Sequence, residues 1–209
     1  MKLQNFAENQ WVFGADDGNQ LRSAIDGSIV ATIDTTGINF KGMLNYARRV
    51  GGPNLRQYTF HERALMLKKL AQYLMKGKKE FYDLSTQTGA TQDDSYIDID
   101  GGISTLFVYS SKGRREMPND RIYVDGQPEI LSRQGTFVGQ HIYTPRHGAA
   151  VHINAYNFPC WGMLEKLAPC LLAGVPAIVK PASSTAYLTE LIVRRMIESK
   201  ILPEGAVQL

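Results

Sequence analysis

Asn157 is the residue whose type and position point most directly to chemistry. It lies in a polar turn between an apolar run that ends at Ile153 and an apolar helical pattern that begins at Trp161. An amide N–H at such a turn can donate to the negative charge that develops on a carbonyl oxygen during a reaction. Asn is also a common N-terminal cap of helices. The residues alone leave both roles open.

Lys180 is the second candidate because it ends another apolar run, Ala177 to Val179, and Pro181 follows it. A lysine at the end of a buried strand needs a partner, and a ligand hydroxyl or phosphate would supply one. Alternatively, its stem lies along the surface and its ammonium stays in water. The position at the strand end favours a ligand.

The elements that carry these residues form a regular alternation at the end of the chain. Apolar periodicity predicts strands over 149–153 and 177–180, helices over 161–172 and 187–199, and a strand that begins at Ala206. This βαβαβ pattern is typical of a parallel sheet, which binds ligands beyond the carboxyl ends of its strands. Loops 154–160 and 181–185 follow those ends, so we expect the functional site there.

The remaining elements are predicted from turns and caps. Residues 11–35 alternate short apolar runs with Asp-Gly turns, which indicates a small β-appendage. A capping box at Thr59 and Glu62 starts a helix with an apolar face through Leu74, and further helices are expected over 78–87 and 93–114. Residues 121–153 are β-branched and aromatic, with turns predicted at Asp125-Gly126 and Gln134-Gly135. Such long exposed strands often form an oligomerisation flange.

Composition narrows the possible functions. The net charge is +3 and its charges are scattered, which argues against nucleic acid as a partner. Cys160 and Cys170 are the two cysteines, without the spacing of a zinc site or a disulfide scaffold, so we expect no metal. The sequence has no export signal and no apolar stretch long enough for a membrane span. We therefore expect a cytoplasmic protein without a membrane partner.

Around Asn157 and Lys180 the sequence closely resembles the aldehyde dehydrogenase superfamily, whose members carry an Asn-Phe-Pro turn, a helix and a strand ending in Lys-Pro. The resemblance implies that Asn157 stabilises the substrate oxyanion and that Lys180 contacts the adenosine ribose of the cofactor. It also places Tyr156 at a usual Trp position, and the backbone of Ile153 and Asn154 along the same pocket.

Ser183 matches a position where many NAD-preferring members carry Glu, whose carboxylate would repel a 2′-phosphate. A serine there, beside Lys180, implies NADP as the cofactor, with NAD also possible. Alternatively, Ser183 is a polar loop residue whose identity does not affect cofactor choice.

The resemblance extends over most of the chain, through residues 60–64, 87–91 and 202–206. It implies an α/β, aldehyde dehydrogenase-like fold that is incomplete as a Rossmann-type cofactor-binding domain. Residues 1–120 would supply the N-terminal β-appendage and helices, 121–147 the β-flange for oligomerisation, and 148–209 the first βαβαβ part of the NAD(P)-binding core. Leu209 lies inside an apolar strand, so we expect the core to continue beyond it.

A narrower resemblance covers residues 87–107 and 152–169. These segments are similar to the bifunctional superfamily members of phenylacetic acid degradation, which join an aldehyde dehydrogenase to a MaoC-type hydratase. The resemblance implies that the hydratase opens oxepin-CoA and that the dehydrogenase oxidises the resulting CoA-linked semialdehyde with NADP. Relatives in benzoyl-CoA breakdown oxidise a similar semialdehyde, and that substrate is an alternative.

The family's mechanism also needs a Cys nucleophile and a Glu base, which the resemblance places after Leu209. Cys160 and Cys170 are expected to be packing residues. The four histidines form no recognisable triad with a Ser or Cys. We therefore expect the 209-residue chain alone to be inactive and to bind the cofactor weakly. The alternative from another class is a non-catalytic nucleotide-binding or oligomerisation module.

Overall fold

A three-stranded parallel sheet organises the computed structural model, which describes residues 1–209. Its order is β7 (Ala150–Ile153), β8 (Ala177–Lys180), β9 (Val207–Gln208). Helix α5 (Trp161–Leu172) connects the first two strands, and a 3-10 turn, η3 (Ser183–Thr185), with α6 (Ala186–Glu198) connects the second pair. The βαβαβ unit expected from the sequence is confirmed, with boundaries within one residue of those predicted.

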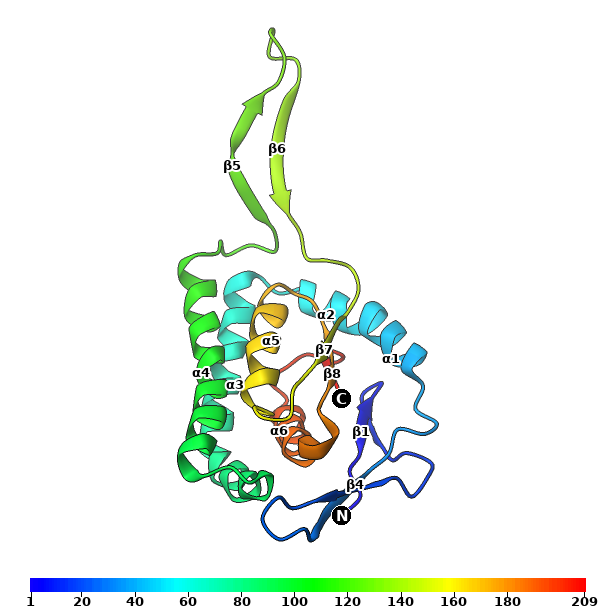
Figure 1. The fold of residues 1–209 in the computed structure, drawn as a ribbon. Helices are drawn as coiled ribbons and strands as arrows, with labels where there is room; N and C mark the ends of the chain where they lie inside the picture. The colour runs from blue at the N-terminus through cyan, green and yellow to red at the C-terminus, as the bar shows by residue number, and fades with distance from the viewer.

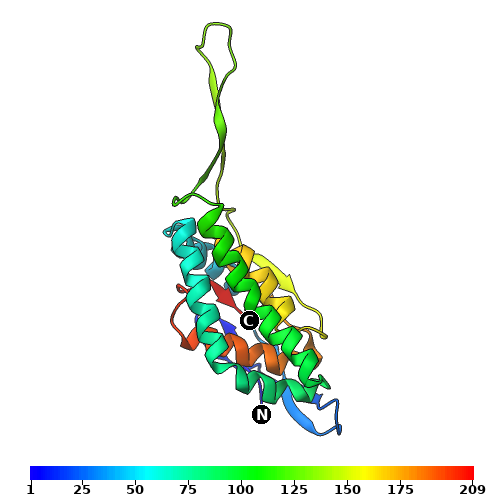
Figure 2. The same cartoon turned by 90° about the vertical axis from the view of Figure 1, so that its left-hand side faces the viewer.

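Two long helices form a second layer outside α5 and α6 (Figures 1 and 2). Helix α3 spans Phe60–Ser85 and α4 spans Gln92–Arg115. A capping box starts each helix, one from Thr59 and Glu62 as predicted. The separate helix expected over 78–87 is wrong, because α3 continues through Gly77, and a 3-10 turn, η2 (Thr86–Thr88), follows it.

Packing explains the continuity of α3. A glycine inside a helix costs only about 1 kcal/mol relative to alanine, and the helix regains more than this by burying Phe81 beyond it. The main core lies between the helical layer and the sheet and has one contiguous set of apolar side chains. Among its fully buried members are Leu67, Leu70, Leu74, Ile99, Ile103, Leu106, Met163, Leu164, Leu188, Ile192 and Val193.

The N-terminal strands form two hairpins rather than one. Strands β1 (Asn5–Ala7) and β2 (Gln10–Val12) pair antiparallel, as do β3 (Asn19–Arg22) and β4 (Ile29–Ile33). The segment is also more than an appendage. Phe6 and Leu209 exchange two backbone hydrogen bonds of 3.0 and 2.9 Å, so the start of the chain extends the parallel sheet beyond β9.

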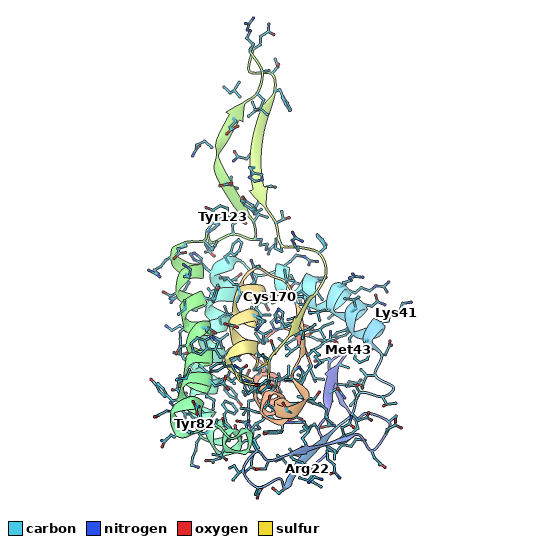
Figure 3. All side chains as sticks on the ribbon, in the orientation of Figure 1. Arg22, Lys41, Met43, Tyr82, Tyr123 and Cys170 are labelled. Carbon is cyan, nitrogen blue, oxygen red and sulfur yellow. The ribbon has the colours of Figure 1, made fainter.

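Residues 40–56 form a helical segment that the sequence analysis did not predict. It consists of α1 (Phe40–Tyr46), a π-helical turn η1 (Ala47–Gly51) and α2 (Gly52–Arg56). Figure 3 shows Met43 on the inner side of α1 and Lys41 on its outer side. The buried Gln208 side chain donates to the Met43 carbonyl oxygen at 2.8 Å. Helix α1 therefore packs at the edge of the sheet that β9 forms.

Strands β5 (Tyr123–Ile130) and β6 (Val138–Tyr143) form a hairpin that projects from the rest of the molecule (Figure 1). The predicted long, exposed strands are confirmed. The predicted turn at Asp125-Gly126 is wrong, because it is an irregularity inside β5, where Gly126 has φ +68°. A positive φ suits a bulge as well as a turn, so the residue types alone did not distinguish the two.

None of the helices combines the length and the apolar character needed to cross a membrane.

Candidate functional site

The loop of residues 154–160 lies beyond the carboxyl end of β7, beside the end of β8. Ile153 pairs with Lys180, and the Asn154 N–H donates to the Lys180 carbonyl oxygen at 3.1 Å. The Thr185 hydroxyl donates to the Tyr156 carbonyl oxygen at 3.2 Å. The two loops expected to carry the site are therefore hydrogen-bonded to each other.

A cavity of about 600 Å³ lies between strands β7 and β8, the start of α6, the N-terminal segment and α1. Val151, Ile178 and Lys180 contribute to it from the sheet, and Ser183 also lines it. Ala186 and Glu190 of α6 also line it. The remaining walls come mainly from the N-terminal segment and from α1, with Gln4, Asp34, Thr36, Phe40, Met43 and Leu44 among them. The sequence analysis missed these wall residues, since no spacing rule links residues 3–44 to the sheet.

Lys180 and Ser183 are both exposed at this cavity. Lys180 forms no ion pair, whereas the nearby acid Glu190 is paired with Arg194. Asp34 accepts hydrogen bonds from the N–H groups of Thr36 and Asp16, and these bonds hold its pKa below the ordinary value. Lys180 is therefore the cation at this cavity without a carboxylate partner.

The other predicted cofactor residues lie outside the cavity lining. Ile153 and Tyr156 are exposed along the turn, and Val151 is exposed on the same side of β7 as Ile153. Asn154 points to the opposite side and is buried, and its side-chain oxygen and nitrogen have no hydrogen-bond partner. The structure thus brings Lys180 and Ser183 together at the cavity and places the 153–157 turn beside it.

Asn157 does not cap α5, so the capping alternative is wrong. The N-cap residue of α5 is Cys160, which makes no side-chain capping bond, and the exposed Asn157 side chain makes no hydrogen bond. Asp98 of α4 caps the helix instead, by accepting from the Cys160 and Trp161 N–H groups. The amide of Asn157 is left free to bind something else.

The two cysteines are packing residues. Cys160 is fully buried, and burial raises the pKa of its thiol well above the ordinary range. Cys170 is half-buried, and burial raises its pKa to about 11. A nucleophilic cysteine needs a thiolate near neutral pH. Neither thiol meets that requirement.

Comparison with known protein families matches residues 12–209 to the aldehyde dehydrogenase family. The chain belongs to this family. It is 39% identical over 210 aligned residues to the 3,4-dehydroadipyl-CoA semialdehyde dehydrogenase of Aromatoleum evansii. The alignment covers 100% of this chain and 41% of that relative. The chain is 27% identical over 153 residues to the NADP⁺-dependent D-glyceraldehyde dehydrogenase of Picrophilus torridus, covering 72% of the chain and 29% of that relative.

Solved aldehyde dehydrogenases have the same fold. The structure of 3,6-anhydro-L-galactose dehydrogenase superposes with a TM-score of 0.82 at 20% identity, over 100% of this chain and 42% of that one. The aldehyde dehydrogenase-like α/β fold expected from the sequence is confirmed. This chain spans well under half the length of these relatives.

Proposed function

We propose that this chain is the N-terminal part of an NADP-dependent dehydrogenase that oxidises a CoA-linked semialdehyde. The observation that carries the proposal is the placement of the free Asn157 amide in a turn hydrogen-bonded to the strand end that bears Lys180. The 39% identity to a CoA-semialdehyde dehydrogenase supports the substrate class. The activity of the whole enzyme, of which this chain is a part, belongs to the same proposal.

The residues at the cavity fit the adenosine end of NADP. A volume of about 600 Å³ falls within the ordinary range for a small-molecule site. Lys180 supplies a cation for the ribose or its 2′-phosphate, and Ser183 supplies a hydroxyl rather than a repelling carboxylate. An NADP-dependent relative at 27% identity supports the same choice, and NAD is the alternative cofactor.

Asn157 serves the reaction itself. A bound NADP, held at its adenosine end by Lys180 and Ser183, would supply the hydride acceptor for the reaction. This chain binds and orients the cofactor and stabilises charge on the substrate. The Asn157 amide donates to the substrate oxygen as negative charge grows on it. Tyr156 and the backbone of Ile153 and Asn154, in the same turn, contribute to the neighbouring cofactor site with Lys180 and Ser183. A fixed donor of this kind favours the transition state over the ground state because the charge is larger there.

We further propose that the enzyme acts in phenylacetate catabolism and is fused to a MaoC-type hydratase that acts on oxepin-CoA. A semialdehyde of benzoyl-CoA breakdown is the alternative substrate, and the relative from Aromatoleum evansii favours a dehydroadipyl-CoA-like aldehyde. We also propose that the β5–β6 hairpin joins copies of the chain into a homo-oligomer in the cytoplasm, since its exposed side chains include Val124, Ile130, Phe137 and Val138.

The proposal is tested by the natural gene product that contains these residues. NADPH formation is followed by absorbance with a CoA-linked semialdehyde and with free aliphatic aldehydes. We expect turnover that is fastest with the CoA-linked aldehyde and higher kcat/KM with NADP than with NAD. Absence of aldehyde-dependent reduction with either cofactor contradicts the proposal.

A non-catalytic nucleotide-binding module is the second candidate, favoured by the inert environments of Cys160 and Cys170. Under this alternative, NADP binds with a measurable dissociation constant and no aldehyde accelerates its reduction. The same assay, combined with a binding titration, distinguishes the two functions.

A further inference from the structure

Asp98 is a buried acid on α4 that touches neither the cavity nor the Asn157 side chain. It is 4% exposed. Its Oδ1 accepts from the Trp161 N–H at 2.7 Å and its Oδ2 from the Cys160 N–H at 3.2 Å. A carboxylate that accepts from the free N–H groups at a helix start satisfies them and complements the positive end of the helix dipole. This capping group comes from a different helix.

A pair of glycines lets α4 approach the start of α5 closely. A Cβ on Gly102 would lie 2.8 Å from the Trp161 Cα and 2.9 Å from its nitrogen, both backbone atoms. A Cβ on Gly101 would lie 2.5 Å from the Trp161 ring. Figure 2 shows the two helices side by side. Asp98 and Gly102, one helical turn apart, thus form a socket for the first residues of α5.

The socket fixes one end of the turn that carries Asn157. The Gly162 N–H donates to the Phe158 carbonyl oxygen at 2.8 Å, so the first turn of α5 is continuous with the Phe158-Pro159 segment. At the other end, Thr185 holds the Tyr156 carbonyl oxygen. The backbone is therefore anchored on both sides of Asn157, and the Asn157 side chain is the part left unbound.

We propose that Asp98, with Gly102, is a positioning residue of the enzyme: it holds the start of α5 so that the Asn157 amide points at the substrate oxygen. The inference rests on the proposed function for its catalytic consequence. An error of about 1 Å in the placement of a catalytic group can cost about 100-fold in rate, so the anchor matters even though it never touches the substrate.

The kinetic test uses the natural enzyme and the variants Asp98→Ala, Asp98→Asn and Gly102→Ala. The control is Asp93→Ala, which removes an exposed acid from the first turn of the same helix. We expect Asp98→Ala to lower kcat by about 10- to 100-fold and to leave the NADP dissociation constant within about twofold. Asp98→Asn keeps one acceptor and gives an intermediate loss. An unchanged kcat in a folded Asp98→Ala enzyme overturns the proposal.

A double-mutant cycle separates positioning from general destabilisation. If Asp98 acts through Asn157, the variant that carries both Asp98→Ala and Asn157→Ala has the same kcat as Asn157→Ala alone, within about twofold. All variants are compared at a temperature where they are folded. If the fold-loss of kcat in the double variant equals the product of the two single losses, Asp98 does not act through Asn157. Should Asp98→Ala not fold, Asp98→Asn enters the cycle in its place.

A structural readout keeps the two proposals distinguishable. Amide hydrogen exchange in the peptide that covers residues 156–162 should accelerate by about 10-fold or more in Asp98→Ala and stay unchanged in Asp93→Ala. Faster exchange in an enzyme without aldehyde turnover would refute the proposed function alone. Normal exchange in a folded variant would refute the positioning role.

Discussion

At the scale of single residues, the site depends on which polar groups are already engaged and which are free. Glu190 is paired with Arg194, and Asp34 accepts from backbone N–H groups, so neither carboxylate neutralises Lys180. Asn157 is free because Asp98 supplies the helix cap that an asparagine in this turn could have provided. The proposed roles in binding and charge stabilisation therefore belong to Lys180 and Asn157, two side chains that the fold leaves unpaired.

Ser183 allows a test of cofactor choice. Ser183→Glu places a carboxylate where the 2′-phosphate of NADP is proposed to bind, so it should raise the NADP dissociation constant by about 10-fold or more and leave that of NAD equal or lower. Fluorescence titration with NADPH and NADH measures both constants. Ser184→Glu, at an exposed neighbour outside the cavity lining, is the matched control. Equal effects on the two cofactors would be inconsistent with this assignment.

The ionisation of Asp98 predicts a pH dependence of stability. Burial raises the pKa of this carboxyl to about 6, from an ordinary 3.8, against the opposing hydrogen bonds of Trp161 and Cys160. A pKa that is higher in the folded state means that the folded protein binds more protons between these values, so this contribution to stability is lost as the pH rises from about 4 to about 6. The facing thiol of Cys160 stays protonated in this range, and Asp100 on the same helix is paired with Lys78.

Urea unfolding of the wild type and of Asp98→Asn between pH 4 and pH 7 checks this sign. The free energy of unfolding of the wild type, minus that of the variant, should decrease with rising pH by at most about 3 kcal/mol and then level off. Parallel curves over the whole range would show that the Asp98 carboxyl is not perturbed.

At the scale of elements, the parallel βαβαβ unit was predictable because apolar periodicity and turn residues agree over residues 149–209. The separate helix expected over 78–87 was wrong because burial of Phe81 outweighs the local propensity of Gly77 to interrupt α3. The pair Gly101-Gly102 carried a usable signal of close helix approach, but its partner, Trp161, lies far along the chain. The cavity walls from residues 3–44 were unpredictable for the same reason, since only tertiary contacts bring them to the sheet.

Arg63 links three elements. Its guanidinium is almost completely buried and donates to the Leu172 carbonyl oxygen at 2.8 Å, to Leu55 and to Tyr58, so it joins α3 to the ends of α5 and α2. Burial lowers its pKa to about 10, which leaves it charged at neutral pH.

Arg63→Met should therefore destabilise the fold by about 2–4 kcal/mol, because it leaves buried carbonyl oxygens without donors. Thermal unfolding followed by circular dichroism measures the loss. Arg115→Met, at an exposed position near the end of α4, should change stability by less than about 0.5 kcal/mol. A similar small effect at Arg63 would mean that the carbonyl groups find other donors.

At the scale of the whole molecule, the β5–β6 hairpin stands out because it exposes large apolar side chains, Val124, Ile130, Phe137, Val138 and Ile142 among them. The hairpin extends away from the body of the molecule (Figure 1), so its side chains have little of the chain's own surface to pack against. Ile130 is 72% exposed and pairs with Val138, which is 52% exposed. An isolated two-stranded hairpin is only marginally stable in water. Contact with a second copy would stabilise it.

Ile130→Asp should weaken self-association, because it places a charge in the proposed contact. Sedimentation velocity of the natural protein should show a lower oligomeric state or a dissociation constant raised by about 10-fold or more. Ile25→Asp, at a similarly exposed apolar position on the β3–β4 turn, should have no such effect. An unchanged assembly in Ile130→Asp would exclude the hairpin as the contact.

The central claim is that one turn stabilises the reacting oxygen while the neighbouring strand end binds the cofactor. The most direct measurement compares Asn157→Ala with the wild type in the natural enzyme, recording kcat for NADPH formation and the NADP dissociation constant. The account predicts a kcat lowered by about 100- to 1000-fold, as for the loss of one oxyanion donor, with a dissociation constant changed by less than about twofold. A variant that keeps its kcat, or that loses NADP affinity in proportion to its rate, would contradict this account.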